Sequence, residues 1–118
     1  MELSIKQSYL AMFYLLDSIY DNTKDECLGS LLGGFNPHLF VESMSADPAA
    51  WGDWKNMVIR ITNKELLTVD EALEVTQKFI IFHRDEFGFD LDWLIDRLNT
   101  MTSNNEDWLS SIKKALSR

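Results

Sequence analysis

Two stretches of this chain begin in the same way and keep matching residue types as they continue. Residues 3–22 read LSIKQSYLAMFYLLDSIYDN, and residues 67–86 read LTVDEALEVTQKFIIFHRDE. Each opens with the pattern of a capping box, formed by Ser4 with Gln7 and by Thr68 with Glu71. In a capping box, the hydroxyl and the later polar side chain accept hydrogen bonds from free backbone N–H groups at a helix start. Two matching helix starts with similar spacing downstream favour a chain built from two similar halves.

The match continues beyond the first helix of each half. Asp21 corresponds to Asp85, a second group of apolar positions aligns after a slip of one residue, and Asp53-Trp54 then falls opposite Asp107-Trp108. We predict an internal pseudo-repeat of about residues 3–62 and 67–118 within a single helical domain of residues 1–118. The aligned apolar pairs are Leu28 with Leu91, Leu31 with Leu94, Leu32 with Ile95, and Phe35 with Leu98.

Apolar residues at helical spacing predict three helices in the first half. The first runs from about Ile5 to Asp21 and the second from about Glu26 to Leu32. A glycine of the GGFNP segment, residues 33–37, is expected to end the second helix by adopting a positive φ. Residues 36–46 are predicted as a loop with a short extended piece at His38–Val41, and the third helix should fade near Thr62.

The second half repeats this order, with helices predicted at about residues 69–86, 91–101 and 105–116. No stretch alternates apolar and polar residues over a useful length, so the sequence lacks a strand pattern. We therefore predict an all-α fold of about six helices, arranged as two similar three-helix halves in one compact bundle.

The segment ADPAAWGDW, residues 46–54, predicts the start of the third helix and its anchor. Asp47 is a predicted N-cap, and Pro48 fits the first helical position, where its missing N–H is not needed. Trp51, Trp54 and Val58 recur on one face of that helix and are expected to pack between the two halves. Tryptophan is also frequent at protein interfaces, so a contact role for one of the two stays open. We assign a structural motif to Asp47, Pro48, Trp51, Asp53 and Trp54.

The charge of the chain disfavours one class of partner. Its formal net charge is −8, so it would repel the phosphates of DNA and RNA, whereas a basic protein is a natural partner. The single cysteine, Cys27, rules out an intramolecular disulfide and favours a reducing compartment. The N-terminus lacks the basic leading region of a signal peptide, and no stretch approaches the roughly 18 apolar residues of a membrane span. We expect a cytoplasmic protein that does not enter a membrane.

The sequence shows no catalytic signature. The two histidines, His38 and His83, have no Cys or second His at ligand spacing, and the triplet of residues 83–85 lacks the glycine-rich loop and lysine that a kinase needs. Cys27 lies among leucines without a neighbouring histidine, which indicates a half-buried structural cysteine. The aromatic run from Phe79 to Phe89 is interpreted as core. We therefore predict no enzymatic activity, no cofactor and no bound metal.

Acidic residues cluster at corresponding places in the two halves, with five acids and no base between residues 85 and 96. Carboxylates converging from two helices can bind a metal ion or perform acid–base chemistry, but helical metal sites usually bring histidines at set spacing, and none are present. The other interpretations are a solvated helix end and a docking patch for a basic partner. The predicted partner-binding residues are Asp21, Asp25, Glu26, Asp85, Glu86, Asp90 and Asp92.

Three features together resemble a known family. They are the capping-box start with an aromatic-rich helix, the LGSLLGG segment at residues 28–34, and ADPAAWGDW at residues 46–54. The chain resembles small α-helical bacterial immunity proteins of contact-dependent inhibition and polymorphic toxin systems. The resemblance covers about residues 3–60, and the second half joins it only through the internal repeat. It implies a protein without catalytic activity that binds one toxin domain, often a nuclease with a basic substrate groove, and blocks its active site.

Three hypotheses about function remain open on the sequence. The first is an immunity protein whose acidic surface and exposed aromatic side chains occlude the C-terminal domain of a cognate toxin. The second is an acidic helical adaptor or regulatory module with another protein partner, which shares the absence of catalytic residues. The third is a small metal-dependent enzyme built on the acidic clusters, which predicts stoichiometric divalent metal in the purified protein.

Overall fold

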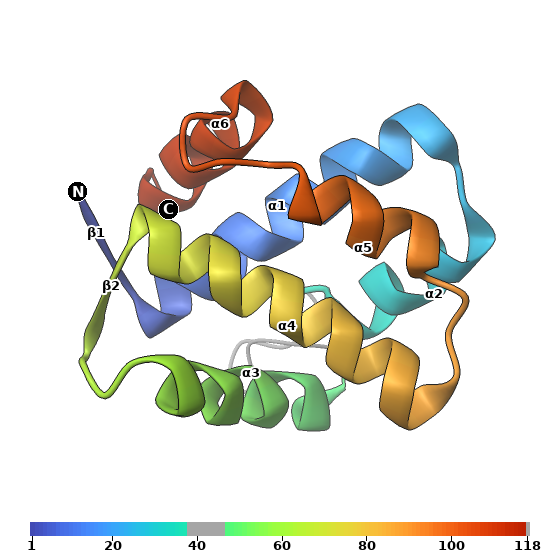
Figure 1. Cartoon of the computed structure of the whole chain (residues 1–118), viewed down its shortest axis with the longest axis horizontal. Helices are drawn as coiled ribbons and strands as arrows, with labels where there is room; N and C mark the ends of the chain where they lie inside the picture. The colour runs from blue at the N-terminus through green and yellow to red at the C-terminus, as the bar shows by residue number, and fades with distance from the viewer. Residues whose placement is uncertain (38–46, 118) are drawn as a thin grey trace.

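A computed structural model of the chain describes residues 1–37 and 47–117, which form six helices and one two-stranded antiparallel sheet (Figure 1). This part of the chain confirms the predicted all-α fold with six helices. The radius of gyration is 12.9 Å, which matches the value of about 13 Å that a compact chain of roughly this size has. The elements are β1 (Glu2–Ser4), α1 (Ile5–Thr23), α2 (Glu26–Phe35), α3 (Pro48–Ile61), β2 (Leu66–Thr68), α4 (Val69–Phe87), α5 (Asp92–Asn99) and α6 (Glu106–Leu116).

Both predicted capping boxes form. The Gln7 N–H donates to Ser4 Oγ at 3.0 Å, and the Ser4 N–H donates back to Gln7 Oε1 at 2.9 Å. Thr68 and Glu71 make the same two bonds at 3.1 and 2.9 Å. These boxes start α1 and α4, and each of these helices has 19 residues. The long helices of the two halves therefore begin alike and have equal length.

The short sheet joins the two helix starts and was not predicted. β1 and β2 pair with Leu3 opposite Leu67, and both leucines are fully buried. These two leucines are also the first aligned pair of the predicted repeat, so the two halves begin side by side in space (Figure 1). Strands of three residues are too short to show an alternating pattern, which is why no strand could be recognised from the residues alone.

The third helix of each half packs against the long helix of the other half. In Figure 1, α3 lies along α4 and α6 lies along α1, and these pairs are in contact. Trp54 of α3, fully buried, packs edge-on against Phe79 of α4 at 5.1 Å and donates from Nε1 to Ser8 Oγ of α1 at 3.2 Å. Trp108 of α6 is also fully buried and donates to the Val69 carbonyl at 3.3 Å. Trp54 therefore links α3 to both α4 and α1, and Trp108 links α6 to the start of α4.

The predicted end of the second helix is wrong. Gly33 and Gly34 do not stop α2, which continues to Phe35. Phe35 is buried against Phe79 at 5.2 Å, and its carbonyl accepts a hydrogen bond from the Tyr9 hydroxyl. Glycine in a helix costs about 1 kcal/mol relative to alanine, and these tertiary contacts offset that cost. The residues with a left-handed backbone in the described part are instead Lys24 and Gly88, just after α1 and α4.

The other predicted helices differ from the structure only near their ends. The fifth helix covers Asp92–Asn99 where residues 91–101 were predicted, and Asn105 is the N-cap of the sixth helix rather than its first residue. The third helix ends at Ile61 with Thr62 as its C-cap, where it was expected to fade. The predicted extended piece at His38–Val41 lies outside the described residues.

Candidate partner-binding surface and pocket

The α1–α2 turn and the α4–α5 turn meet beside Cys27. Burial raises the pKa of the half-buried Cys27 thiol, a hydrogen bond with the Asp90 backbone opposes that rise, and the carboxylates of Asp25 and Asp90 add to it. Because the Asp90 backbone forms a hydrogen bond with the thiol and the Asp25 carboxylate is close enough to affect it, Asp25 and Asp90, one from each turn, lie near the same thiol. We call the acidic residues of these two turns the acidic end. They are Asp25, Glu26, Asp85, Glu86, Asp90 and Asp92.

Arg84 places one positive charge inside the acidic end. Its guanidinium donates to Asp92 at 2.9 Å and to Asp85 at 3.0 Å, and these two hydrogen bonds raise the pKa of Arg84. Exposed ion pairs of this kind contribute little to stability. They do fix the orientation of two predicted carboxylates. Asp21, the seventh predicted residue, is exposed and pairs with Lys24 at 3.6 Å.

The other four members of the acidic end differ in the contacts that they make. Asp25 is the N-cap of α2, where its carboxylate accepts a hydrogen bond from the Leu28 N–H at 2.9 Å. Glu26, Glu86 and Asp90 are exposed and form no ion pair with another described residue. These three carboxylates are therefore available to a partner.

The ADPAAWGDW segment starts α3, anchors it and supplies the wall of a pocket. Asp47 is the N-cap, accepting a hydrogen bond from a backbone N–H two residues on at 3.0 Å, and Pro48 is the first helical residue. Trp51 is half-buried and packs edge-on against Tyr9 at 5.4 Å. Asp53 is also half-buried and lines a cavity next to α3. The segment therefore starts and anchors α3, and several of its residues also line the cavity.

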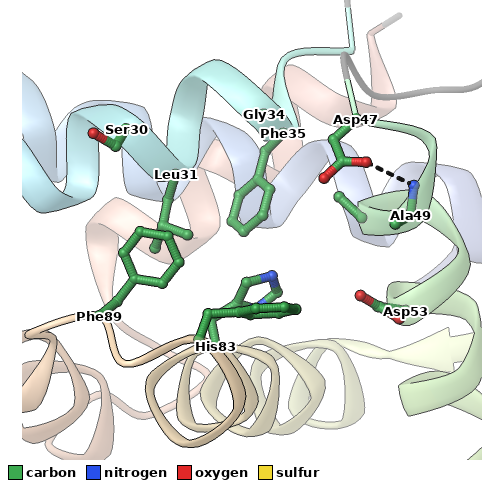
Figure 2. A pocket seen from close by; sticks show the side chains of 11 residues that line it. Ser30, Leu31, Gly34, Phe35, Asp47, Ala49, Asp53, His83 and Phe89 are labelled. Atoms are coloured by element: carbon green, nitrogen blue, oxygen red, sulfur yellow. Dashed lines mark hydrogen bonds between the residues drawn. The ribbon is translucent and has the colours of Figure 1, made fainter.

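The cavity has a volume of about 260 Å³ and lies between α2, the start of α3 and the end of α4 (Figure 2). Figure 2 shows the Phe35 ring entering from α2, the Asp53 carboxylate facing in from α3, and the His83 ring rising from α4. Phe89, from the turn after α4, closes the side near Leu31. We call this cavity the α2–α4 pocket.

Phe87 lines the α2–α4 pocket and corrects one prediction. The aromatic run from Phe79 to Phe89 was interpreted as core, and Phe79 is fully buried, but Phe87 is 59% exposed. The helix ends at Phe87 because Gly88 follows with a φ of 71°. The last side chain of α4 therefore lies outside the core, at the wall of the pocket.

His83 is the buried polar residue of the α2–α4 pocket, with 5% of its surface exposed. Its Nδ1 lies 2.9 Å from the Phe79 carbonyl, and because a carbonyl can only accept, Nδ1 carries the proton. Burial lowers the pKa of His83, and the opposing effects are the hydrogen bond to Phe79 and the carboxylates of Asp53 and Asp47. The ring is therefore neutral at neutral pH.

The α2–α4 pocket was not predicted from the sequence, although a sequence pattern indicates the part of its wall that α4 supplies. His83 and Phe87 are four residues apart on α4 and so share one helix face. That spacing, with a glycine directly after Phe87, indicates an aromatic face at a helix end. No local pattern indicates that Asp53 contributes to the pocket, because that contribution depends on how α3 packs against α4.

Within residues 1–37 and 47–117, no group of three or more His, Cys, Asp or Glu side chains is arranged to hold a metal ion. No helix among these residues is both long enough and apolar enough to span a bilayer. Comparison of the chain with protein-family models, with curated protein sequences and with solved structures gave no match.

Proposed function

We propose that this protein is an immunity protein that binds the C-terminal domain of a cognate bacterial toxin and occludes its active site. The toxin domain is a nuclease with a basic substrate groove, and the inhibitor acts without catalysis, cofactor or metal. The contact surface is the acidic end together with the exposed ring of Phe87. The observation that carries the proposal is that Asp25 and Asp90, from the acidic turns of the two halves, both lie near Cys27, while the exposed Phe87 directly follows Glu86 in the chain.

This combination of charge and aromatic surface suits tight binding of a basic protein. Opposite fields raise the association rate constant from about 10⁵–10⁶ to as much as 10⁸–10⁹ M⁻¹s⁻¹ at low salt. Aromatic side chains near the centre of an interface carry a large share of its binding free energy. Glu26, Glu86 and Asp90 supply the field, and Phe87 supplies apolar contact area.

Three of the six carboxylates of the acidic end already make contacts within the protein before a partner arrives. Asp25 is fixed by its capping bond, and Asp85 and Asp92 are fixed by Arg84. A surface that is already ordered loses less conformational entropy on binding, which favours affinity. The framework therefore supports inhibition by steric occlusion with little rearrangement.

The test is co-expression of the chain with the product of the neighbouring upstream reading frame, followed by stopped-flow association at several salt concentrations. We expect a one-to-one complex whose association rate constant falls as salt rises. The double variant Glu86→Lys and Asp90→Lys should lower that constant by roughly tenfold at low salt and weaken its salt dependence.

The control makes the same change in charge elsewhere on the protein. Glu65 and Glu74 are exposed and lie just before and near the start of α4, whereas Glu86 lies in its last turn. The variant Glu65→Lys and Glu74→Lys should change the association rate much less than the variant of the acidic end. Equal effects of the two variants would refute the choice of surface. Failure to form any complex with a toxin domain, with a different protein captured instead, would favour the adaptor hypothesis.

A further inference from the structure

The volume of the α2–α4 pocket limits what can occupy it. Pockets for drug-sized ligands and cofactors have volumes of about 300–1,000 Å³, and this one has about 260 Å³. The volume therefore suits one long side chain of a protein partner better than a nucleotide or another large cofactor.

Aromatic rings form much of the wall. The His83 ring lies 5.0 Å from the Phe35 ring and 5.4 Å from the Phe87 ring, and Phe87 lies 6.5 Å from Phe89. Ring faces attract cations electrostatically, and a guanidinium group is preferred because it is planar, weakly hydrated and able to stack. The wall is therefore suited to an arginine side chain rather than to a compact, strongly hydrated ammonium group.

Asp53 gives the pocket a negative charge. Its carboxylate is half-buried, faces into the cavity and has no hydrogen bond or ion pair with another described residue (Figure 2). A carboxylate near apolar walls is costly to desolvate unless a cation pairs with it. His83 does not supply that cation, since its ring is neutral at neutral pH. A guanidinium group can pair with such a carboxylate through two parallel hydrogen bonds.

The pocket adjoins the acidic end. Phe87 lines the pocket and directly follows Glu86, while Phe89 lines the pocket and directly precedes Asp90. A basic partner drawn to these two carboxylates therefore arrives beside two residues of the pocket wall.

We propose that the α2–α4 pocket receives an arginine side chain of the basic protein partner, with its guanidinium paired to Asp53 and stacked on the exposed ring of Phe87. This inference deepens the proposed function and rests on it for the identity of the partner. It assigns Asp53 as the specificity-determining residue and the pocket as the anchor point of the complex.

The chemistry of the pocket can be tested without a toxin, by NMR titration with Nα-acetyl-arginine N-methylamide. We expect saturable shifts of backbone amides around the pocket, such as those of Gly34, Ala49 and Ala50, with a dissociation constant on the order of millimolar. The citrulline analogue has nearly the same shape without the charge, and the lysine analogue has the charge without the planar group. Both should bind at least several-fold more weakly.

The variant Asp53→Asn should weaken binding of blocked arginine roughly tenfold, whereas Asp96→Asn, at an exposed position on α5, should leave it unchanged. Both variants must keep the thermal unfolding midpoint of the parent. Absence of saturation, equal binding of the citrulline or lysine analogue, or an unchanged constant in folded Asp53→Asn would each overturn the inference.

Titration of the toxin domain separates this inference from the proposed function. If both hold, Asp53→Asn raises the dissociation rate constant of the complex, and the variant of the acidic end lowers the association rate constant. If only the variant of the acidic end has an effect, the arginine inference fails and the proposed function stands. If blocked arginine binds but no toxin domain does, the pocket assignment stands and the immunity function fails.

Discussion

The two halves of the molecule share a framework but place different side chains upon it. Each begins with a three-residue strand and a capping box, continues with a long helix, and turns at a left-handed residue. In the predicted repeat, however, His83 aligns with Ile19, and Phe87 aligns with Thr23. Ile19 is buried in the core, whereas His83 and Phe87 line the α2–α4 pocket. Positions 19 and 83 and positions 23 and 87 therefore carry different residue types in the two halves, and in the second half these positions contribute His83 and Phe87 to the pocket.

The largest expected effect tests whether the tryptophans of α3 and α6 contribute equally to the stability of the protein. Trp54→Ala and Trp108→Ala each remove a fully buried ring and a hydrogen-bond donor. Each should lower the free energy of unfolding by about 3–5 kcal/mol, measured by urea denaturation followed by circular dichroism. A domain of this size has about 5–15 kcal/mol in total, so Trp→Phe variants provide a milder pair. A loss below about 1 kcal/mol at one site would show that the halves do not share this anchor.

The next comparison concerns the capping boxes. Ser4→Ala and Thr68→Ala each remove a side-chain oxygen that accepts a hydrogen bond from a backbone N–H in the first turn. Each change should cost about 0.5–2 kcal/mol, and the two costs should be similar because the geometry is the same. Chemical denaturation at pH 7 measures both, with Ser110→Ala, at an exposed position within α6, as the control. Clearly unequal costs would contradict the equivalence of the two helix starts.

The turns after α1 and α4 differ in residue type at the same backbone geometry. Lys24 has a φ of 52° and Gly88 a φ of 71°. A residue with a Cβ atom is strained there, although glycine gives the unfolded chain more freedom. Lys24→Gly should therefore stabilise the protein, and Gly88→Lys should destabilise it, each by about 0.5–1 kcal/mol. Thermal unfolding of the two single variants and of the exchanged double variant measures this. If Lys24→Gly destabilised the protein and Gly88→Lys stabilised it, side-chain contacts rather than backbone strain would determine the stability of these turns.

Features that depend on neighbours in the sequence could be predicted from it. The capping boxes and the Asp47-Pro48 helix start rest on side chains within a few residues of the backbone groups that they satisfy, and the end of α3 near Thr62 rests on a local backbone hydrogen bond to Val58. Such hydrogen bonds form wherever the helix forms, so the sequence shows them directly.

Features that depend on distant segments could not be predicted. The helix α2 passes through two glycines because Phe35 packs on Phe79 and bonds Tyr9, which no local pattern reveals. The sheet joins Leu3 to Leu67 across the length of one half. The α2–α4 pocket forms because α3 packs against α4 in a way that brings Asp53 near His83. Each of these outcomes depends on packing between segments that are distant in the sequence.

The last comparison concerns how the two capping boxes respond to acid, and its expected effect at neutral pH is the smallest. Glu71 has its pKa lowered from 4.5 to about 2, first by its hydrogen bond with the Thr68 backbone and then by Lys64, 3.0 Å away. A lowered pKa in the folded state means that the contribution to stability is complete above pH 4.5 and is lost as pH falls towards 2. Gln7, in the same position of the first half, does not titrate.

Glu71→Gln should therefore change stability little at pH 7 and reduce the loss of stability between pH 4.5 and 2, measured by urea denaturation against the parent protein. The reverse change, Gln7→Glu, should introduce an acid dependence into the first half. The backbone hydrogen bond is common to both boxes, but the ion pair with Lys64 belongs to the second. If Gln7→Glu adds less acid dependence than Glu71→Gln removes, the difference measures what the lysine contributes. Identical slopes for Glu71→Gln and the parent would instead show that the cap does not hold the carboxylate in its charged form.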